Sequence, residues 1–314
     1  MAVTKKPVKH KIGWIGLGRM GFAMSQRLLK NGCDVSVWNR TQSKADPLAE
    51  YGARIVNRIS DLSGCDMVFT MVSTTDDLMQ VLFGKGGLLT GARKPKMVID
   101  NSSISDDGSA EIRARCAKLK VAYLCAPVSG NAKVAKAGTL WTVASGPASA
   151  FKVAEPYLAM FGRGVTYVGE GELARVWKIA HNTMFGVVIQ NLCEITVMAE
   201  KAGIPRHLFL ESINDSVLGS MYTRYKTPML TNLTFDQVTF TPQLLLKDMD
   251  LGMAAAKAQG VCMPAAAATR ESVARMVGRG YDNIDFAALL VETARDAGLE
   301  LKSENKTISD GLSS

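Results

Sequence analysis

The segment ARVWKIAHNTMFGVVIQ, residues 174 to 190, carries a lysine and an asparagine four residues apart in a run that is otherwise almost wholly apolar. On a helix, Lys178 and Asn182 share one face, and His181 lies beside them. An ammonium group in a partly desolvated cleft can donate a proton and stabilise a developing alkoxide. The pattern leaves a second interpretation open, in which the Lys178 stem crosses apolar surface and its ammonium group stays in water.

A second chemical signal is the glycine pattern GWIGLGRMG, which follows the first apolar run of the chain. The first glycine of such a loop makes a tight turn, the second lets the backbone approach a pyrophosphate, and the third allows close packing of helix on strand. A strand before the loop and a helix after it are the context that a dinucleotide site requires. The expected cofactor-binding residues here are Gly16, Leu17, Gly18, Arg19, Met20 and Gly21.

The end of the second expected strand bears on the choice of cofactor. An NAD site usually has an acidic residue there, which accepts a hydrogen bond from the ribose 2′-hydroxyl. This chain has Asn39, Arg40 and Thr41 in VWNRT instead. A guanidinium group binds phosphate through two parallel hydrogen bonds, so the segment favours NADP(H) over NAD(H). The alternative is that Arg40 is an ordinary solvent-facing arginine of a loop.

These residues need elements to position them, and the chain provides two kinds. From Lys11 to about Gly169, eight short β-rich runs alternate with helical segments, which predicts a mostly parallel sheet covered on both faces. After Gly171 the apolar residues recur at helical spacing, beginning with a helix of some thirty residues that ends before Gly203 and Pro205. We therefore expect an α/β chain: a Rossmann-type doubly wound domain over 11–172, a long connecting helix, and an all-helical domain over 173–303. Residues 1–10 and 304–314 are expected to be flexible tails.

Composition excludes several classes of function. The formal charge is +8, but half of it comes from Lys5, Lys6, Lys9 and Lys11, and no basic stripe with interleaved aromatic residues follows. No apolar run is long enough to span a membrane, and the first ten residues lack the apolar core of a secretory signal. The six cysteines form no CxxC pair, which argues against a disulfide framework or a metal site. A cytoplasmic protein without nucleic-acid or membrane partners is expected.

Four motifs together resemble one protein family. IGLGRMG, APVSGNAKVAKAGTL, KIAHN and LLLKDMDLGMAAA, in this order and spacing, are similar to the β-hydroxyacid dehydrogenase family, which includes 3-hydroxyisobutyrate, tartronate semialdehyde and threonate dehydrogenases and related imine reductases. The resemblance extends from about Lys11 to Leu301. It implies a dehydrogenase that transfers a hydride between a nicotinamide and the 3-hydroxyl carbon of a small 3-hydroxy acid or 3-hydroxy amino acid.

The resemblance also implies roles for individual residues. Lys178 would be the proton relay to the substrate oxygen, supported by Asn182. The PVSG segment would bind the substrate carboxylate, at Ser129, Gly130 and the following Asn131. Further cofactor-lining positions would be Met71, Val72, Ser103 and Lys247, with Asp248 orienting the last of these. For Ser103 and Lys247, the residues alone favour a loop serine and a surface lysine.

The chain departs from the family pattern in several places. Cys125 stands where the family usually has aspartate before APVSG, and Asn131 replaces a glycine after it. Gly171 lies seven residues before Lys178 rather than four, and His181 takes a position that is often asparagine. These changes place the substrate preference and the entry to the long helix in question, but they retain the lysine.

Two other functions stay open beside the dehydrogenase. One is an imine reductase, although the family's imine reductases generally replace this lysine, and the other is a cofactor-binding interaction module without turnover. The substrate's identity and the physiological direction of the reaction are not determined by the residues. A thirty-residue helix that is apolar on most sides predicts self-association to a dimer or a larger assembly such as a tetramer.

Overall fold

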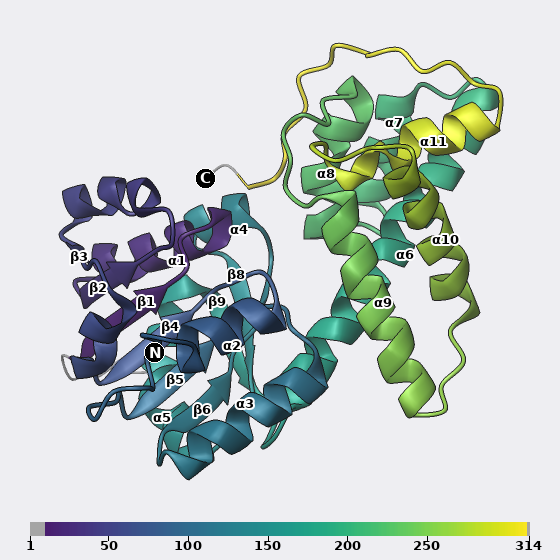
Figure 1. Ribbon diagram of the computed structural model, residues 1–314. Coiled ribbons are helices and arrows are strands. Elements are labelled where there is room, and N and C mark those ends of the chain that lie inside the picture. The colour runs from purple at the N-terminus through teal and green to yellow at the C-terminus, as the bar shows by residue number, and fades with distance from the viewer. Residues whose placement is uncertain (1–9, 313–314) are drawn as a thin grey trace. The chain divides into compact units, whose positions relative to one another are not determined.

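The computed structural model describes residues 10–312, and the chain divides into two compact units (Figure 1). The first unit extends through Lys178 and the second begins at Ile179, so the division falls inside helix α6 (Leu173–Lys201). The sequence placed the boundary at the start of this helix, between 172 and 173. The first turns of α6 belong with the first unit because Ala174 and Trp177 pack into its hydrophobic core. Most of the expected N-terminal tail lies outside the described residues.

Six parallel strands form the main sheet of the first unit. They are β1 (Lys11–Ile15), β2 (Asp34–Trp38), β3 (Arg54–Ile55), β4 (Met67–Thr70), β5 (Met97–Asp100) and β6 (Ala122–Cys125). Their spatial order is β3-β2-β1-β4-β5-β6, with every pairing parallel. Strand order reverses at β1, and open sheets of this kind bind ligands beyond the carboxyl ends of the strands at such a point. The predicted doubly wound architecture is confirmed.

A second, three-stranded sheet was not predicted. Its strands are β7 (Val128–Ser129), β8 (Leu140–Ala144) and β9 (Gly162–Tyr167), in that order. We expected the last two of these to belong to the main sheet. The connection between β7 and β8 holds only the short helix α4 (Ala132–Lys136), which is less chain than a parallel crossover needs, and the two strands pair antiparallel. An isolated bridge between Cys125 and Ser145 joins the two sheets.

Helices α1 (Arg19–Lys30), α2 (Thr75–Phe83), α3 (Asp106–Lys118) and α5 (Ala148–Leu158) complete the first unit. Leu78 of α2 and Ile112 of α3 share a core cluster with Val68 of β4. The neighbouring Phe69 points to the opposite face of the sheet, where it stacks on Trp14 with 5.3 Å between ring centroids. Both faces of the strands are thereby buried, as a parallel sheet requires.

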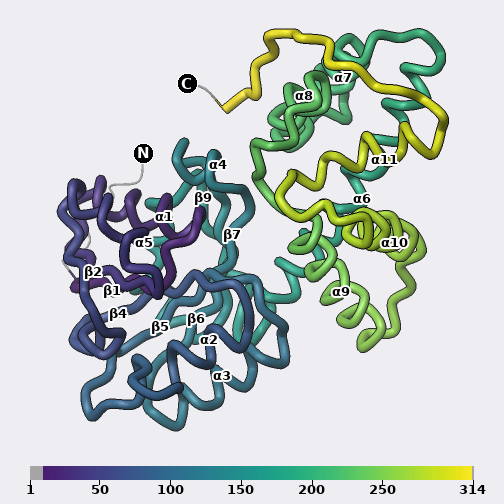
Figure 2. Tube along the Cα trace, turned by 45° about the horizontal axis from the view of Figure 1, so that its top comes forward, coloured from purple at the N-terminus to yellow at the C-terminus, as the bar shows by residue number. Residues whose placement is uncertain are grey.

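The second unit is helical, with no strand among its described residues. After α6 come α7 (Arg206–Asp215), α8 (Met221–Asn232), α9 (Pro242–Ala258), α10 (Pro264–Gly278) and α11 (Leu289–Asp296). In Figure 1 and Figure 2, α9 and α10 lie side by side. Helix α9 also packs closely on α6 at Gly252. A Cβ at this position would lie only 1.9 Å from Thr183 Oγ1, so the two helices could not approach as closely with a larger residue there. In the described part of the chain, no helix has the length and apolarity to cross a membrane.

Two local expectations differ from the structure of this unit. The segment SMYTRYKTP has the composition of a loop, which makes Tyr222, Arg224 and Tyr225 candidates from the sequence for contacting the distal end of a substrate or for an ordinary interdomain contact, but the segment forms most of α8. Ser220 and Thr223 make a reciprocal capping box, which stabilises the helix start despite Pro228 further along. The segment expected as a flexible C-terminal tail makes unanticipated hydrogen bonds: Glu304 accepts from the backbone N–H groups of Arg206 and His207, at 2.9 and 2.8 Å.

A buried ion pair lies in the core of the second unit. Lys226 Nζ is 2.5 Å from Asp285 Oδ1, and both side chains are at most 1% exposed. Asp285 Oδ2 also accepts from the backbone N–H of Thr239, and Lys226 Nζ lies 4.6 Å from the Phe286 ring centroid. A buried carboxylate with its cation removed has no compensating charge. Because Lys226 lies in α8 and Asp285 in the segment before α11, the pair links these two parts of the unit.

Replacing the lysine tests the importance of that link. Lys226→Met is expected to lower the free energy of unfolding by about 3–5 kcal/mol, because Asp285 stays buried without its partner. Urea unfolding followed by circular dichroism measures the loss. Arg275→Met, which removes an exposed ion pair with Asp296 in the same unit, is the matched control. Equal losses in the two variants would contradict the assignment.

Candidate active site

The glycine turn has the geometry of a phosphate cradle. Gly16 has φ +95°, and a Cβ there would lie 2.2 Å from the carbonyl oxygen of Met71. A Cβ at Gly21 would lie 2.0 Å from the carbonyl oxygen of Gly16. A Cβ at Gly18, by contrast, would meet no described atom within 4 Å. The first and third glycines are required by packing, whereas the second borders open space at the start of α1.

That open space lies where an anion would bind. Gly18 is the N-cap of α1 and has no side chain with which to cap the helix. The backbone N–H groups of a first helical turn, together with the helix dipole, attract phosphate. The turn is braced from the side because Leu17 N–H donates to Asn39 Oδ1 at 2.8 Å. These features fit a dinucleotide whose pyrophosphate approaches the backbone at Gly18.

The residues after β2 divide into a structural and an exposed set. Asn39 uses its amide internally: Oδ1 accepts from Leu17 N–H, and Nδ2 donates to the carbonyl oxygen of Thr41 at 2.8 Å. The Arg40 side chain is 87% exposed, with Nη1 3.6 Å from Asp77 Oδ1. An exposed guanidinium in a loose ion pair can turn toward a ligand phosphate at little cost. Arg40 is thus available for the role expected of it, whereas Asn39 holds the glycine turn.

The turns after β4 and β5 are tied together by a serine that the sequence analysis missed. Val72 N–H donates to Ser102 Oγ at 2.9 Å, and Ser102 Oγ donates to Asp100 Oδ1 at 2.7 Å. Thr70 Oγ1 donates to the same carboxylate oxygen at 2.6 Å. The expected cofactor-lining residues Met71, Val72 and Ser103 therefore lie in two adjacent turns that share one buried carboxylate.

Lys178 lies beside the PVSG segment. Its side chain is half-buried, and Nζ donates to the carbonyl oxygen of Val128 at 2.8 Å. Ser129 and Gly130 follow directly, and Gly130 has φ +124°, with a hypothetical Cβ only 2.6 Å from Leu140 Cδ2. A side chain at position 130 would be both strained and in collision. The structure thus brings the expected proton relay to the expected carboxylate-binding turn.

Asn131 has a structural use in addition to its expected one. It is the N-cap of α4, and its Oδ1 accepts from the backbone N–H groups of Lys133 and Val134 at 2.9 and 3.1 Å. Its Nδ2 is buried and meets no hydrogen-bond acceptor among the described residues. The side chain that replaces the family glycine therefore shapes the end of the PVSG turn.

In the second unit, the carboxylate of Asp248 contacts two expected site residues, Asn182 and Lys247. Asn182 Nδ2 donates to Asp248 Oδ2 at 2.5 Å, and Lys247 Nζ is 3.1 Å from Asp248 Oδ1. His181 Nδ1 lies 3.0 Å from Asn182 Oδ1, so the Asn182 amide is held from both ends. The expected site residues thus form two sets, one around Lys178 in the first unit and one around Asp248 in the second.

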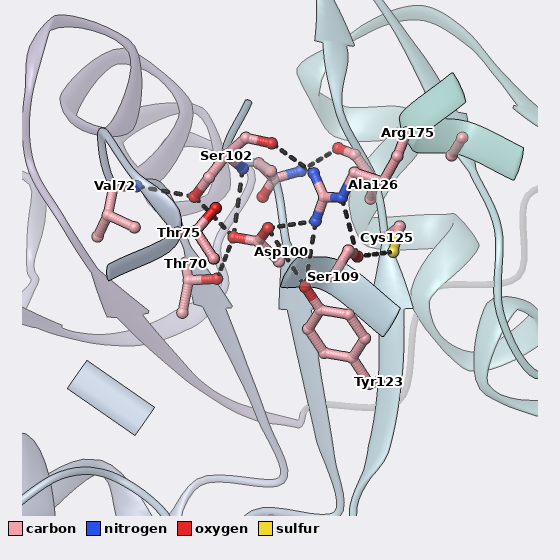
Figure 3. Close-up of polar contacts among 12 residues, drawn as sticks. Thr70, Val72, Thr75, Asp100, Ser102, Ser109, Tyr123, Cys125, Ala126 and Arg175 are labelled. Atoms are coloured by element: carbon pink, nitrogen blue, oxygen red, sulfur yellow. Dashed lines mark hydrogen bonds and ion pairs between the residues drawn. The ribbon is translucent and has the colours of Figure 1, made fainter. Parts of the chain in front are cut away.

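A buried ion pair in the first unit, close to Lys178 in the chain, was not predicted. Arg175, three residues before Lys178, is 1% exposed and forms an ion pair with Asp100, which is fully buried (Figure 3). The signal was present, because Arg175 is a second cation in the same apolar helix. The sequence could not identify its partner, which lies 75 positions away.

Cys125, the replacement for the usual aspartate before APVSG, lies next to this network. Its side chain is buried, and burial raises the pKa of the thiol, so the group stays uncharged at neutral pH. Its Sγ is 3.2 Å from Ser109 Oγ. The position therefore supplies no negative charge, and Asp100 is the carboxylate that faces Arg175. Within residues 10–312, no three His, Cys, Asp or Glu side chains are grouped to hold a metal ion.

Comparison with known families places both units. Residues 11–169 match the family described as the NAD binding domain of 6-phosphogluconate dehydrogenase. Residues 171–292 match the family described as NAD-binding of NADP-dependent 3-hydroxyisobutyrate dehydrogenase. The two matches meet close to the start of α6.

Individual relatives cover nearly the whole chain. Probable 3-hydroxyisobutyrate dehydrogenase-like 3, mitochondrial, of Arabidopsis thaliana is 33% identical over 93% of this chain and 90% of its own length. Glyoxylate/succinic semialdehyde reductase 1 of the same plant is 30% identical over 89% of this chain and 97% of its own. The solved structure of Mycobacterium tuberculosis 3-hydroxyisobutyrate dehydrogenase with L-serine is 25% identical, with TM-score 0.79, and the similarity covers 91% of this chain and 99% of that one.

The open space at Gly18 leads to a prediction about cofactor binding. Gly18→Ala is expected to leave the unfolding midpoint unchanged but to raise the Kd for NADPH about 10-fold or more, because the methyl group occupies the path of the pyrophosphate. NADPH fluorescence titration measures the Kd. Gly21→Ala is the matched control and should unfold more easily, since its Cβ collides with the Gly16 carbonyl oxygen. A Gly18→Ala protein with wild-type affinity would refute this geometry.

Proposed function

Because the chain belongs to the β-hydroxyacid dehydrogenase family of NAD(P)-dependent oxidoreductases acting on CH–OH groups, we propose that it interconverts a small 3-hydroxy acid and its carbonyl form, with NADP(H) preferred. The nicotinamide, when bound, accepts or returns the hydride at C4. The protein's own residues then have three tasks: to hold the dinucleotide, to hold the substrate carboxylate, and to move the hydroxyl proton.

Proton movement is assigned to Lys178, and the contact between its ammonium group and the PVSG segment is the observation that carries the proposal. The hydrogen bond from Lys178 Nζ to the carbonyl oxygen of Val128, at 2.8 Å, holds the ammonium group beside the residue that directly precedes Ser129. In a 3-hydroxy acid a single carbon separates the carboxylate from the carbon that bears the hydroxyl. A substrate whose carboxylate binds at Ser129 and Gly130 therefore has its 3-hydroxyl close to this turn. Lys178 can donate a proton to the carbonyl oxygen during reduction and accept one from the hydroxyl during oxidation.

Carboxylate binding is assigned to the Ser129–Gly130 turn. Gly130 has a backbone conformation that favours glycine, and turns of this kind can direct N–H groups toward an anion. The Ser129 hydroxyl provides a further donor. Asn182, held by Asp248 in the second unit, is proposed to support the proton relay, and Lys247 is proposed to contact the nicotinamide end of the cofactor.

The preference for NADP(H) rests on the loop after β2. Its three residues, Asn39, Arg40 and Thr41, include no carboxylate to accept from a ribose 2′-hydroxyl. The exposed Arg40 guanidinium can bind a 2′-phosphate through paired hydrogen bonds. The second family match, to an NADP-dependent enzyme type, supports the same preference.

The substrate class can be tested with a panel taken from the relatives. Its members are 3-hydroxyisobutyrate and L-serine for oxidation, and glyoxylate and succinic semialdehyde for reduction. Nicotinamide absorbance is followed with NADP(H) and NAD(H) in parallel. We expect turnover of 3-hydroxyisobutyrate or L-serine, whereas turnover of glyoxylate or succinic semialdehyde alone would move the assignment to a 2-hydroxy or a 4-hydroxy acid. Lys178→Ala should lose about 10²-fold in kcat, because the proton relay is removed.

The control for this experiment is Lys133→Ala, an exposed lysine of α4 in the same unit that is assigned no part in the reaction. It should retain wild-type rates. Wild-type rates in Lys178→Ala would contradict the proton-relay assignment. With a cyclic imine added to the panel, no turnover of any member despite NADPH binding would favour a binding module, and turnover of the imine alone would favour an imine reductase.

We also propose that the protein associates with itself through α6. Four large apolar side chains of this helix are exposed in the isolated chain: Leu173, Val176, Met184 and Met198, at 50%, 44%, 68% and 66%. Large apolar side chains exposed along one helix offer surface that a second copy of the chain can cover. Light scattering after size exclusion should give at least twice the chain mass of 33.8 kDa, and Met184→Glu with Met198→Glu should lower it. A monomer mass for the wild type would end this proposal.

A further inference from the structure

Arg175 makes an unusually complete set of contacts for a single side chain. Its Nη2 donates to Asp100 Oδ2 and, at 3.2 Å, to the hydroxyl of Tyr123. Its Nη1 donates to the carbonyl oxygen of Ser102, and its Nε donates to Ser109 Oγ at 3.2 Å. Figure 3 shows the guanidinium group between these residues, which come from β5, β6, α3 and the turn after β5. All three guanidinium nitrogens therefore have partners within the first unit.

Asp100 extends this set of contacts to the turns at the carboxyl edge of the sheet. Its second oxygen, Oδ1, accepts from Thr70 Oγ1 and from Ser102 Oγ at 2.6 and 2.7 Å. Ser102 Oγ in turn accepts from Val72 N–H. One buried ion pair thus holds two turns. It holds the turn after β5 through the hydroxyl and the carbonyl oxygen of Ser102, and the turn after β4 through the bond from Val72 N–H to the same hydroxyl.

The same side chain holds the start of α6. Arg175 and Lys178 are three residues apart on this helix and therefore project from neighbouring positions on its surface. The guanidinium group fixes the first turn of α6 to β5 and β6, and one turn later Nζ of Lys178 reaches the carbonyl oxygen of Val128. The position of Lys178 relative to the two turns thus depends on the buried pair.

Stability alone is a poor reason for such a pair. Removing two charges from water costs more than their attraction commonly returns, and well-packed apolar residues are often as stable or more so. A planar guanidinium that donates through all three of its nitrogens does, however, define direction and distance more strictly than apolar packing. The arrangement is suited to holding distant segments in one geometry.

We propose that Arg175 is a positioning residue for the reaction: it holds Lys178 and the cofactor-facing turns after β4 and β5 in a single fixed arrangement. The proposal rests on the proposed function for its kinetic consequence. It has a second consequence that does not require turnover, since the turns at Val72 and Ser103 are those expected to line the cofactor.

A double-mutant cycle tests whether Arg175 acts through Lys178. Arg175→Met is expected to lower kcat about 10-fold or more in the otherwise wild-type protein, because a misplaced proton relay is costly. In the Lys178→Ala background the same substitution should lower kcat by less than about 2-fold, since coupled residues are not additive. Arg175→Lys, which keeps the charge but loses the fork, should recover part of the rate.

Cofactor binding is the second measurement. Arg175→Met should raise the Kd for NADPH about 3-fold or more by fluorescence titration, in both backgrounds, because the turns at Val72 and Ser103 lose their common support. Arg115→Met, which removes an exposed ion pair with Glu111 on α3, is the matched control and should change neither kcat nor Kd. All variants are compared at a temperature where circular dichroism shows each to be folded.

Several outcomes would overturn the proposal. Equal factors in kcat in the two backgrounds would show that Arg175 does not act through Lys178. A lower melting temperature with unchanged kcat and Kd would leave the pair a structural link only. If Arg175→Met does not fold, Tyr123→Phe removes one contact of the guanidinium, and its kcat should fall only when Lys178 is present. A wild type without turnover would refute the proposed function, whereas an unchanged NADPH Kd in Arg175→Met would refute the cofactor part of this inference.

Discussion

Asp100 lies at the carboxyl end of β5 with no exposure to solvent, and a buried carboxylate must be neutralised and hydrogen-bonded to persist. Arg175 supplies the charge, and Thr70, Ser102 and Tyr123 surround the pair. Because these partners come from separate segments of the first unit, the requirement to satisfy one charge brings the segments together. The turns after β4 and β5 and the start of α6 all depend on this contact.

The conformation of the glycine turn depends on close packing of backbone atoms rather than on a buried charge. Gly16 and Gly21 are packed against backbone carbonyl oxygens, so the strand, the turn and α1 approach one another as closely as atoms allow. Gly18, between them, borders open space at a helix N-terminus. One short segment therefore provides both a rigid support and an anion-binding surface, and the exposed Arg40 adds a cation after β2.

The long helix α6 contributes to both units, and its polar residues have different kinds of partner in each. In its first turns, Arg175 is buried against the sheet and Lys178 reaches the PVSG segment. Beyond the unit boundary, Asn182 is held by Asp248 of α9, where Gly252 allows the two helices to approach closely. The residues that the family resemblance assigns to one reaction are thus each fixed by a different set of neighbours.

Much of this protein was determined by local patterns in the sequence. The alternation of β-rich runs and helices, the glycine turn after the first strand, and the cation-bearing helix at 174–190 are all encoded in windows of ten to thirty residues, where periodicity and turn chemistry act. The helical start of α8 is local too: it depends on the capping box of Ser220 and Thr223, whose stabilising effect outweighs the loop-like composition around Pro228. The tertiary structure alone decided the rest: the pairing of Arg175 with Asp100, the separate sheet of β7, β8 and β9, and the hold of Asp248 on Asn182. These contacts join segments far apart in the chain and follow from topology and strand register, which no local window contains.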